Sequence, residues 1–237
     1  MTWVAGVDGC PKGWFRASRE VDSGVLRFDL IEDAKELCCF STGEPTPAVV
    51  GIDMPIGLPA QGARACDRAA RERLGARRSS VFPAPIRAAL RATSHEEASR
   101  ITEAVDGRRV SVQAWNLFAR IRELDILLAP AAGARAPLRE VHPEVSFCAW
   151  NGGQPMAAAK RSPDGRRERL ALVEAWLGEG VLERARGPHP KKHLADDDIL
   201  DSIAVLWTAQ RIAEGRAQTL PGSPPRDEIG LPMEIVF

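Results

Sequence analysis

The sequence predicts an α/β fold in which three antiparallel strands lead into parallel strands, with a large helical insertion between two of the parallel strands. Two observations carry this prediction. Short apolar runs with strand spacing occupy the first 54 residues, and a long block with helical spacing then separates them from the next such run. Antiparallel neighbours need only a tight turn, whereas parallel strands need a long connection that is usually helical. The order of elements therefore indicates a mixed sheet.

The first three predicted strands lie near the N-terminus. Residues 3–8 form an apolar run that ends at Asp8, and the turn sequence GCPKG follows it. Residues 14–21 and 25–31 alternate imperfectly on either side of a short Asp-Ser-Gly turn. This pattern predicts a β-hairpin beside the first strand, which gives three antiparallel strands.

A fourth strand is predicted at residues 48–54. It follows a segment with helical spacing at residues 33–40 and a Pro-rich loop at residues 43–47. The apolar run of this strand is nearly continuous, as expected for a parallel strand that is buried on both faces. It ends in a second acid, Asp53.

Residues 55–137 form the predicted helical insertion. Helical spacing is found at residues 63–74, 94–105 and 111–128, and a Pro-rich VFPAP segment and a glycine separate these helices. We therefore expect this block to contribute no strand to the sheet.

The remaining elements follow the insertion. We expect a fifth strand at residues 138–142, an extended piece at residues 147–150, a helix at residues 164–177 and a long helix at residues 196–214. The closing residues 233–237 are predicted to add an edge strand. Together these elements suit one domain that spans residues 1–237.

The composition is that of a globular protein with a full core. The chain has 237 residues, of which 44% are hydrophobic and 27% are charged, and 32 basic side chains balance 32 acidic ones. This composition excludes the disordered and disulfide-scaffold classes. A net charge of zero argues against a protein that binds nucleic acid over its whole surface, so any site for a polyanion has to be a local basic patch.

Neither a membrane span nor a signal peptide is predicted. Charged residues interrupt every apolar stretch well before about 18 residues, and no basic N-terminal region precedes a cleavage site. We therefore expect a cytoplasmic protein. The five cysteines are odd in number and include no C-x-x-C pair, which favours free thiols over disulfides or a zinc site. The oligomeric state stays open, with a homodimer as one alternative.

Asp8 and Asp53 each end an apolar run that is predicted to be a strand. If the fourth strand lies parallel to the first through a right-handed crossover, the C-terminal ends of both meet at one edge of the sheet. The two carboxylates would then lie about 5 Å apart at the backbone, which is repulsive unless a proton or a cation intervenes. Open sheets bind ligands at this edge.

Asp198 and Asp201 lie three residues apart on one face of the last predicted helix, at the head of an otherwise apolar stripe. Unpaired charge is costly in such a place. Helix capping explains acids in the first turn, and we assign it mainly to Asp196 and partly to Asp197. Capping does not explain Asp201, which lies inside the helix.

These acids form an all-oxygen set without thiolates or paired histidines, which suits Mg²⁺ or Mn²⁺. Two such ions can activate a water molecule and stabilise the leaving oxygen of a phosphodiester. We therefore predict four metal ligands, namely Asp8, Asp53, Asp198 and Asp201. Whether Asp197 takes the place of Asp198 stays open.

The segment VHPEVSF adds a carboxylate and an imidazole after the fifth predicted strand. Pro143 favours an extended backbone at His142, which presents Glu144 on the following turn. In one interpretation Glu144 completes the metal site, and His142 moves protons or contacts the substrate. In the other, the segment is a turn with a solvated Glu144 and a hydrogen-bonded His142.

Several blocks of the sequence together resemble one protein family. The blocks are GVDGCPKGW, VVGIDMPIGLP, CDRAARERLGARRSSVFPAP, SVQAWNL, REVHPEVSFCAWNGG and DDDILDSIAVLWTAQRIA. In this order they are similar to the family of predicted RNase H-like nucleases catalogued as domain of unknown function 429, over nearly the whole chain. The resemblance implies an RNase H-like fold, with a mixed sheet and a helical insertion, and a nuclease activity.

The same resemblance implies which residues are catalytic: Asp8, Asp53, Glu144, Asp198 and Asp201. The last two resemble the D-x-x-D-A-L helix of Holliday-junction resolvases, with Ser202 in place of the alanine. By this resemblance, hydrolysis would leave a 5′-phosphate and a 3′-hydroxyl.

A basic helix face in the insertion is the predicted substrate surface. Arg64, Arg68 and Arg71 fall at positions i, i+4 and i+7, and further arginines follow up to Arg78. A nucleic-acid backbone would suit this face, whereas the alternative is a solvated face that neighbouring acids partly neutralise. Lys12, in the loop after the first strand, is a further candidate phosphate contact. Basic residues between 160 and 169 form a second, vaguer cluster.

The sequence leaves three functions open. A metal-dependent phosphodiesterase that acts on DNA or RNA explains the separately placed acids. A phosphotransferase of the sugar-kinase and actin type shares the opening G-x-D-G turn, but GIDMPIGLP is a poor phosphate loop and the chain is short for two such domains. The third function is a non-catalytic module that binds nucleic acid or a nucleotide.

Overall fold

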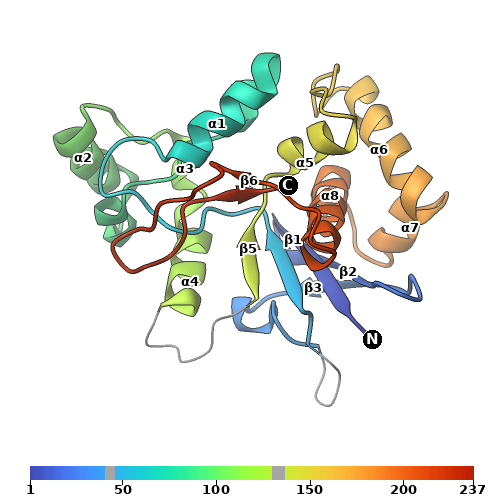
Figure 1. Ribbon diagram of the computed structural model, residues 1–237. Helices are drawn as coiled ribbons and strands as arrows, with labels where there is room; N and C mark the ends of the chain where they lie inside the picture. Colours follow the sequence, from blue (N-terminus) through green and yellow to red (C-terminus); the bar gives the residue numbers. More distant parts are fainter. Residues whose placement is uncertain (41–45, 130–136) are drawn as a thin grey trace.

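A five-stranded mixed sheet forms the centre of the protein (Figure 1). The computed structural model describes residues 1–40, 46–129 and 137–237. The strand order is β3-β2-β1-β4-β5. The strands are β1 (Trp3–Cys10), β2 (Gly13–Glu20), β3 (Leu26–Ile31), β4 (Val49–Ile52) and β5 (Leu138–Glu140).

Antiparallel and parallel pairing meet at β1. Strands β1, β2 and β3 pair antiparallel, whereas β4 lies parallel to β1 on one side and to β5 on the other. The predicted order of three antiparallel strands followed by parallel ones is therefore confirmed. The sheet and its helices are consistent with an RNase H-like α/β fold.

Part of the helical insertion covers one face of the sheet. Its helices are α1 (Ala65–Leu74), α2 (His95–Asp106), α3 (Val112–Trp115) and α4 (Phe118–Leu128). Between residues 55 and 129 the structure contains helices and short 3-10 segments and no strand, as predicted. The third expected helix is interrupted after Trp115, so it forms α3 and α4. The predicted end of the insertion at residues 130–136 lies outside the described residues, as does most of the loop at 43–47.

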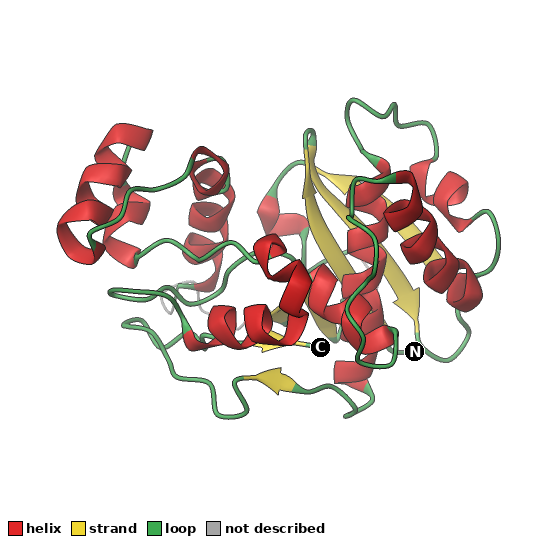
Figure 2. Ribbon diagram, turned by 90° about the horizontal axis from the view of Figure 1, so that it is seen from above, coloured by secondary structure: helices red, strands yellow, loops and turns green. Residues whose placement is uncertain are grey.

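The C-terminal part of the chain covers the opposite face, so helices stand on both sides of the strands when the molecule is seen from above (Figure 2). It contains α5 (Pro143–Trp150), α6 (Pro163–Leu177), α7 (Val181–Arg186) and α8 (Asp196–Ala213). A separate two-stranded sheet pairs β6 (Thr219–Leu220) with β7 (Ile235–Val236). The predicted edge strand at 233–237 is thus present as β7, which reaches the main sheet only through a bridge between Val141 and Val236.

Two local predictions were wrong, and one helix was missed. Residues 147–150 belong to helix α5 and are not extended, because six of the eight residues of α5 are buried and burial on all sides removes the helical pattern. Residues 33–40 contain only one 3-10 turn, Ala34–Glu36, in place of a helix. Helix α7 was not predicted, and it lies between two glycines that allow its abrupt ends.

Helix α8 lies unusually close to β1, because glycine at position 6 leaves room for its backbone. A Cβ atom at Gly6 would lie 2.1 Å from the backbone nitrogen of Leu206. The Ser202 hydroxyl donates a hydrogen bond to the carbonyl oxygen of Gly6 (2.8 Å) and accepts one from the backbone N–H of Ala17 (3.2 Å). Residue 202 therefore fixes the first turns of α8 at the centre of the sheet.

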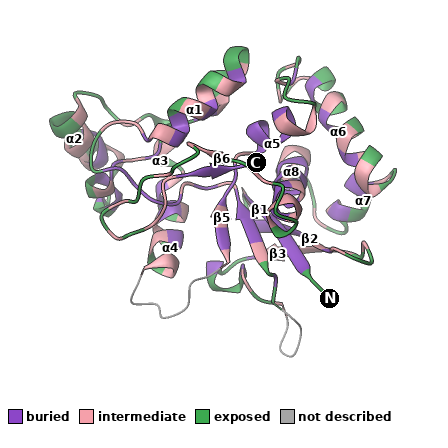
Figure 3. Ribbon diagram, in the orientation of Figure 1, coloured by how far each residue is buried: buried purple, intermediate pink, exposed green. Residues whose placement is uncertain are grey.

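The burial pattern follows this layering. The central strands and the inner side of α8 are buried, and exposed residues lie on the outer turns of the peripheral helices (Figure 3). Three of the five cysteines are buried and all five are free thiols, as predicted. Within the described part of the chain, every helix is too short or too polar to cross a membrane.

Candidate metal centre

Three carboxylates meet at the C-terminal ends of β1 and β4. Asp8 belongs to β1, Asp53 follows β4 directly, and Asp201 lies in the second turn of α8. One oxygen from each side chain lies within 4.8 Å of the others. The pairing of Val7 with Ile52 explains this arrangement, because it places the next residue of each strand side by side. The predicted meeting of Asp8 and Asp53 is thus confirmed.

The cluster lies in a region where negative charge is costly. Asp8 is 9% exposed and Asp201 is 2% exposed. Burial raises the pKa of Asp53 to about 8, with a further contribution from the negative charge of Asp201. Burial also raises the pKa of Asp8 well above its usual value, and repulsion from Asp53 and Asp201 adds to this effect. Three carboxylates in this position need a compensating cation or protons.

The donor atoms of the cluster suit a hard cation. Asp8 Oδ1 accepts a hydrogen bond from the backbone N–H of Gly9 (2.7 Å), which fixes its orientation. Asp201 Oδ1 is buried and has no hydrogen-bond partner among the described residues. A buried carboxylate oxygen without a partner is unfavourable, and coordination to a metal ion would satisfy it. Three carboxylates are the oxygen donors that Mg²⁺ and Mn²⁺ prefer.

Lys160 supplies positive charge next to the cluster. Its ammonium group forms an ion pair with Asp201 Oδ2, although its side chain is only 34% exposed. Burial lowers the pKa of Lys160, but Asp201 and Asp8 raise it more strongly, so the group stays charged. The sequence placed Lys160 only in a vague basic cluster. The contact spans 41 residues, and no local pattern marks it.

Glu144 does not join the three carboxylates. It is 4% exposed, and its two oxygens are bonded to the guanidinium of Arg169 at 2.7 to 3.0 Å. Arg169 is itself 1% exposed. The alternative of a solvated turn residue was wrong, because Glu144 is buried in α5 and paired with a buried arginine. Its predicted catalytic role stays a prediction.

Asp198 has a different partner from the one predicted. Its Oδ2 accepts a hydrogen bond from the backbone N–H of Ala195 (2.9 Å), so it stabilises the beginning of α8. Burial raises its pKa to about 6. Asp196, which was expected to cap the helix, instead pairs with Arg166 (2.7 Å) and Lys191 (3.3 Å). The structure thus assigns the capping role to Asp198, and the group of three does not include it.

His142 lies beside the cluster as a neutral imidazole. Burial lowers its pKa. Its Nε2 lies 3.3 Å from the carbonyl oxygen of Ser80, and because a carbonyl only accepts, Nε2 carries the proton. The other nitrogen, Nδ1, is buried and has no partner within the described residues. Nδ1 is therefore an available proton acceptor.

A cleft of about 600 Å³ lies at the cluster, and Asp198 is not among the residues that line it. Asp8, Asp53 and Asp201 lie in its lining together with His142 and Lys160. Besides the buried Arg64 and Arg169, the lining includes three further arginines and one exposed aromatic side chain: Arg77, Arg120, Arg161 and Phe82. The cleft thus combines an acidic centre with a basic wall.

The comparison with protein families assigns the chain to one of them. The family described as "Protein of unknown function (DUF429)" matches residues 6–226. The chain belongs to this family. No match was found among curated proteins or solved structures.

The predicted basic face of this DUF429 protein is divided between core and surface. Arg64 is 3% exposed, and its guanidinium pairs with Asp67 and Glu140, both at 2.6 Å. The prediction of Arg64 as a substrate contact was wrong, because its charge is used to neutralise two buried acids.

The other residues of the DUF429 chain that are predicted to contact the substrate differ in their exposure and in their hydrogen bonds. Arg71 donates to the carbonyl oxygen of Val81 (2.8 Å), and Arg68 donates to the carbonyl oxygen of Ala63. Lys12 pairs with Glu32 (2.9 Å) and is half-exposed. Arg68 and Arg78 are exposed, so these two remain accessible to a polyanion. Arg77 belongs to the basic stretch predicted as the substrate surface, and Arg161 belongs to the second, vaguer cluster. Arg120 was not predicted, because it comes from a separate element, α4.

Proposed function

We propose that this protein is a divalent-metal-dependent phosphodiester hydrolase that acts on nucleic acid. The observation that carries the proposal is the group formed by Asp8, Asp53 and Asp201, whose oxygens lie within 4.8 Å of one another at the C-terminal edge of the sheet. Ligand sites of open α/β sheets lie at this edge.

Asp8, Asp53 and Asp201 would hold Mg²⁺ or Mn²⁺. Such an ion, when bound, lowers the pKa of a water molecule and stabilises the negative charge that develops on a phosphodiester. The unpartnered Oδ1 of Asp201 supports this assignment, because it offers a buried lone pair that nothing else in the described structure uses.

The fold holds these carboxylates in place before any ligand binds. Asp53 donates its backbone N–H to the carbonyl oxygen of Val7 (3.0 Å), which joins the two strand ends. The Ser202 hydroxyl joins α8 to β1 next to Asp201. Preorganised charge of this kind stabilises a transition state without reorganisation during the reaction.

His142 and the basic wall supply the remaining functions. The free Nδ1 of neutral His142 can accept a proton within the cleft. Arg77, Arg120 and Arg161 can bind phosphate oxygens, and an exposed Phe82 offers a face on which a base can stack. A phosphodiester with a base attached fits this combination of groups.

A cleavage assay tests the proposal. Purified protein is offered single strands, duplexes, RNA:DNA hybrids, four-way junctions and dinucleotides with Mg²⁺ or Mn²⁺. We expect cleavage by the wild type and a loss of several orders of magnitude in Asp8→Asn and Asp53→Asn. Asp164→Asn is the matched control, because Asp164 is an exposed acid that pairs only at the surface with Arg167.

The outcomes separate the alternatives. Cleavage that survives both Asp8→Asn and Asp53→Asn would show that a contaminant is responsible and would contradict the proposal. Binding to one of these nucleic acids without cleavage of any would favour a non-catalytic binding module.

A further inference from the structure

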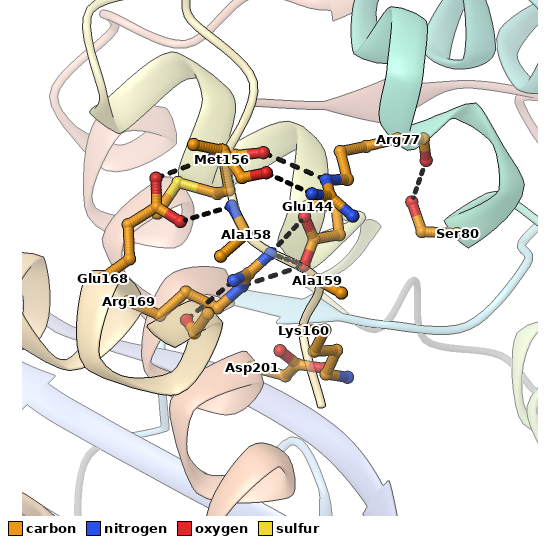
Figure 4. A network of polar contacts seen from close by, with 12 residues as sticks. Arg77, Ser80, Glu144, Met156, Ala158, Ala159, Lys160, Glu168, Arg169 and Asp201 are labelled. Carbon is orange, nitrogen blue, oxygen red and sulfur yellow. Dashed lines mark hydrogen bonds and ion pairs between the residues drawn. The ribbon is translucent and has the colours of Figure 1, made fainter. Parts of the chain in front are cut away.

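The loop that carries Lys160 is fixed from two sides. It connects α5 to α6, and Figure 4 shows the polar contacts that hold it. From the insertion, Arg77 Nε donates to the carbonyl oxygen of Met156 (3.0 Å). From α6, the carboxylate of Glu168 accepts hydrogen bonds from the backbone N–H groups of residues 157 (2.8 Å) and 158 (3.1 Å). Lys160 therefore extends from an anchored segment of chain.

The two oxygens of Asp201 have different surroundings. Oδ2 is paired with the ammonium group of Lys160. Oδ1 is buried and lacks a partner in the described parts of the chain. One carboxylate can therefore bind Lys160 through one oxygen and a metal ion through the other, so the lysine does not have to leave when the ion enters.

The other acids that line the cleft have their own partners. Arg64 binds both Asp67 and Glu140, and Arg169 binds Glu144. Asp198, which lies near the cluster, uses one oxygen to cap α8. Among the described residues, the carboxylates that lie close enough together to share one cation are the three clustered ones.

The charges of this group balance with one divalent ion. Three ionised carboxylates carry three negative charges, and one divalent cation with one ammonium group carries three positive charges. A second divalent ion would leave an excess of positive charge in a buried site with too few oxygen ligands, and uncompensated buried charge is strongly unfavourable.

We propose that the cluster binds a single divalent cation at Asp8, Asp53 and Asp201 Oδ1, and that Lys160 provides the positive charge that a second ion would otherwise supply. This inference rests on the proposed function, since it concerns the same metal site. It replaces the two-ion arrangement expected from the sequence. Lys160 acts in it as a positioning residue, which holds Asp201 by one oxygen and directs the other to the metal.

The test is the number of Mn²⁺ ions bound by the full-length protein, measured by calorimetry and by the electron paramagnetic resonance signal of free Mn²⁺. The wild type is expected to bind one ion per chain. Lys160→Met keeps an unbranched side chain, one atom shorter than that of lysine, and removes its charge. It is expected to bind the first ion about tenfold more tightly or better, and to accept a second one, because the cluster then lacks a positive neighbour.

Two further variants isolate the effect of charge at this position. Lys160→Arg keeps the charge and is expected to bind one ion with an affinity near that of the wild type. Lys191→Met is the matched control, because Lys191 also pairs with an aspartate but lies on the surface with a side chain that is 70% exposed. It is expected to leave the affinity and the stoichiometry unchanged.

The results distinguish this inference from the proposed function. A wild type that binds two ions, or a Lys160→Met variant with the stoichiometry and affinity of the wild type, would overturn the role of Lys160 and leave a metal-dependent hydrolase intact. A wild type that binds no Mn²⁺ would overturn both. If Lys160→Met fails to fold, the wild-type stoichiometry still tests the single-ion site, because two ions per chain would overturn it.

Discussion

The Ser202 hydroxyl donates a hydrogen bond of 2.8 Å to the carbonyl oxygen of Gly6, and this contact fixes α8 against β1 one residue away from Asp201. The contact connects the stability of the fold to the geometry of the site, because the same close approach that buries the helix brings its carboxylate to the strand ends. Gly6 is required for that approach, since α8 occupies the space of a side chain there.

Gly6→Ala is therefore expected to destabilise the protein strongly. The new methyl group would lie 2.1 Å from the backbone nitrogen of Leu206 and 2.3 Å from the carbonyl oxygen of Ser202. Because both are backbone atoms, the helix has to move, and we expect a loss of about 3 kcal/mol or more in the free energy of unfolding. Denaturant titration measures this loss. Gly222→Ala is the control, because a Cβ atom there meets no other atom within 4 Å. Equal stabilities of the two variants would contradict the close packing of α8 on β1.

Arg64 and Arg68 lie close together at the beginning of α1. Their substitution is nevertheless expected to change the free energy of unfolding by different amounts. Arg64→Met leaves Asp67 and Glu140 buried without their cation, and breaking a buried pair costs about 3 to 5 kcal/mol. Arg68→Met removes a charge from an exposed position and should change the free energy of unfolding by less than about 0.5 kcal/mol. Thermal or urea unfolding of the two variants, side by side, measures the difference. An Arg64→Met variant as stable as the wild type would favour the surface role that the sequence predicted for Arg64.

The fold and part of the site could be predicted because they depend on local patterns. Asp8 and Asp53 each follow an apolar run, and the rules for parallel strands then bring them together. Lys160 could not be found in this way, because it lies in a loop without periodicity and contacts Asp201 only through the tertiary structure.

The errors have the same physical origin. The spacing of Arg64 and Arg68 along a helix was correctly recognised, but the burial of Arg64 depends on Glu140, which lies 76 residues away in the sequence. Likewise, the partner of Glu144 is Arg169 from another helix. Sequence patterns indicate which face a residue occupies, and they do not reveal the partner that neutralises its charge.

Exposed arginines are expected to contribute to nucleic-acid affinity through charge. If Arg68 and Arg78 contact phosphates, each contact adds about 0.9 to the slope of log affinity against log salt for a duplex, or about 0.7 for a single strand. The double variant Arg68→Ala with Arg78→Ala should flatten that slope by about two contacts. Arg167→Ala is a suitable control, because its side chain is 77% exposed and pairs only with Asp164. A slope that does not change would show that these arginines belong to a solvated face.

Divalent metal is expected to stabilise the protein through the three carboxylates. An ion at about 100 times its dissociation constant adds about 2.7 kcal/mol to the free energy of unfolding, which for a chain of this size raises Tm by about 5 to 10 °C. Melts with Mn²⁺ at about 5 to 10 mM, a concentration that exceeds the dissociation constant of weak sites, measure the shift. Asp8→Asn should lose most of it, whereas Asp164→Asn should keep it. A shift of equal size in Asp8→Asn and in the wild type would place the ion elsewhere.

The metal-free protein is expected to become less stable as pH rises. The pKa of Asp53 is raised from 3.8 in the unfolded chain to about 8 in the folded protein. The folded state therefore holds a proton that the unfolded state releases, and the stability that this proton provides is complete below pH 3.8 and is lost as pH rises through about 8. In the presence of a metal chelator, Tm should fall between about pH 5 and about pH 9. Asp53→Asn cannot ionise, so its Tm should change less over this range.

Bound metal should reverse the loss of stability with rising pH, because the ion and the protons compete for the same carboxylate oxygens. The increase in Tm caused by Mn²⁺ should thus be small near pH 5 and larger near pH 8 in the wild type, over about the range in which Asp53 loses its proton. In Asp53→Asn the increase should be small at every pH. Differential scanning calorimetry with and without Mn²⁺ measures both trends on the same samples. An increase in Tm that does not depend on pH would mean that the ion binds where no proton has to leave, which excludes the cluster of Asp8, Asp53 and Asp201 as its site.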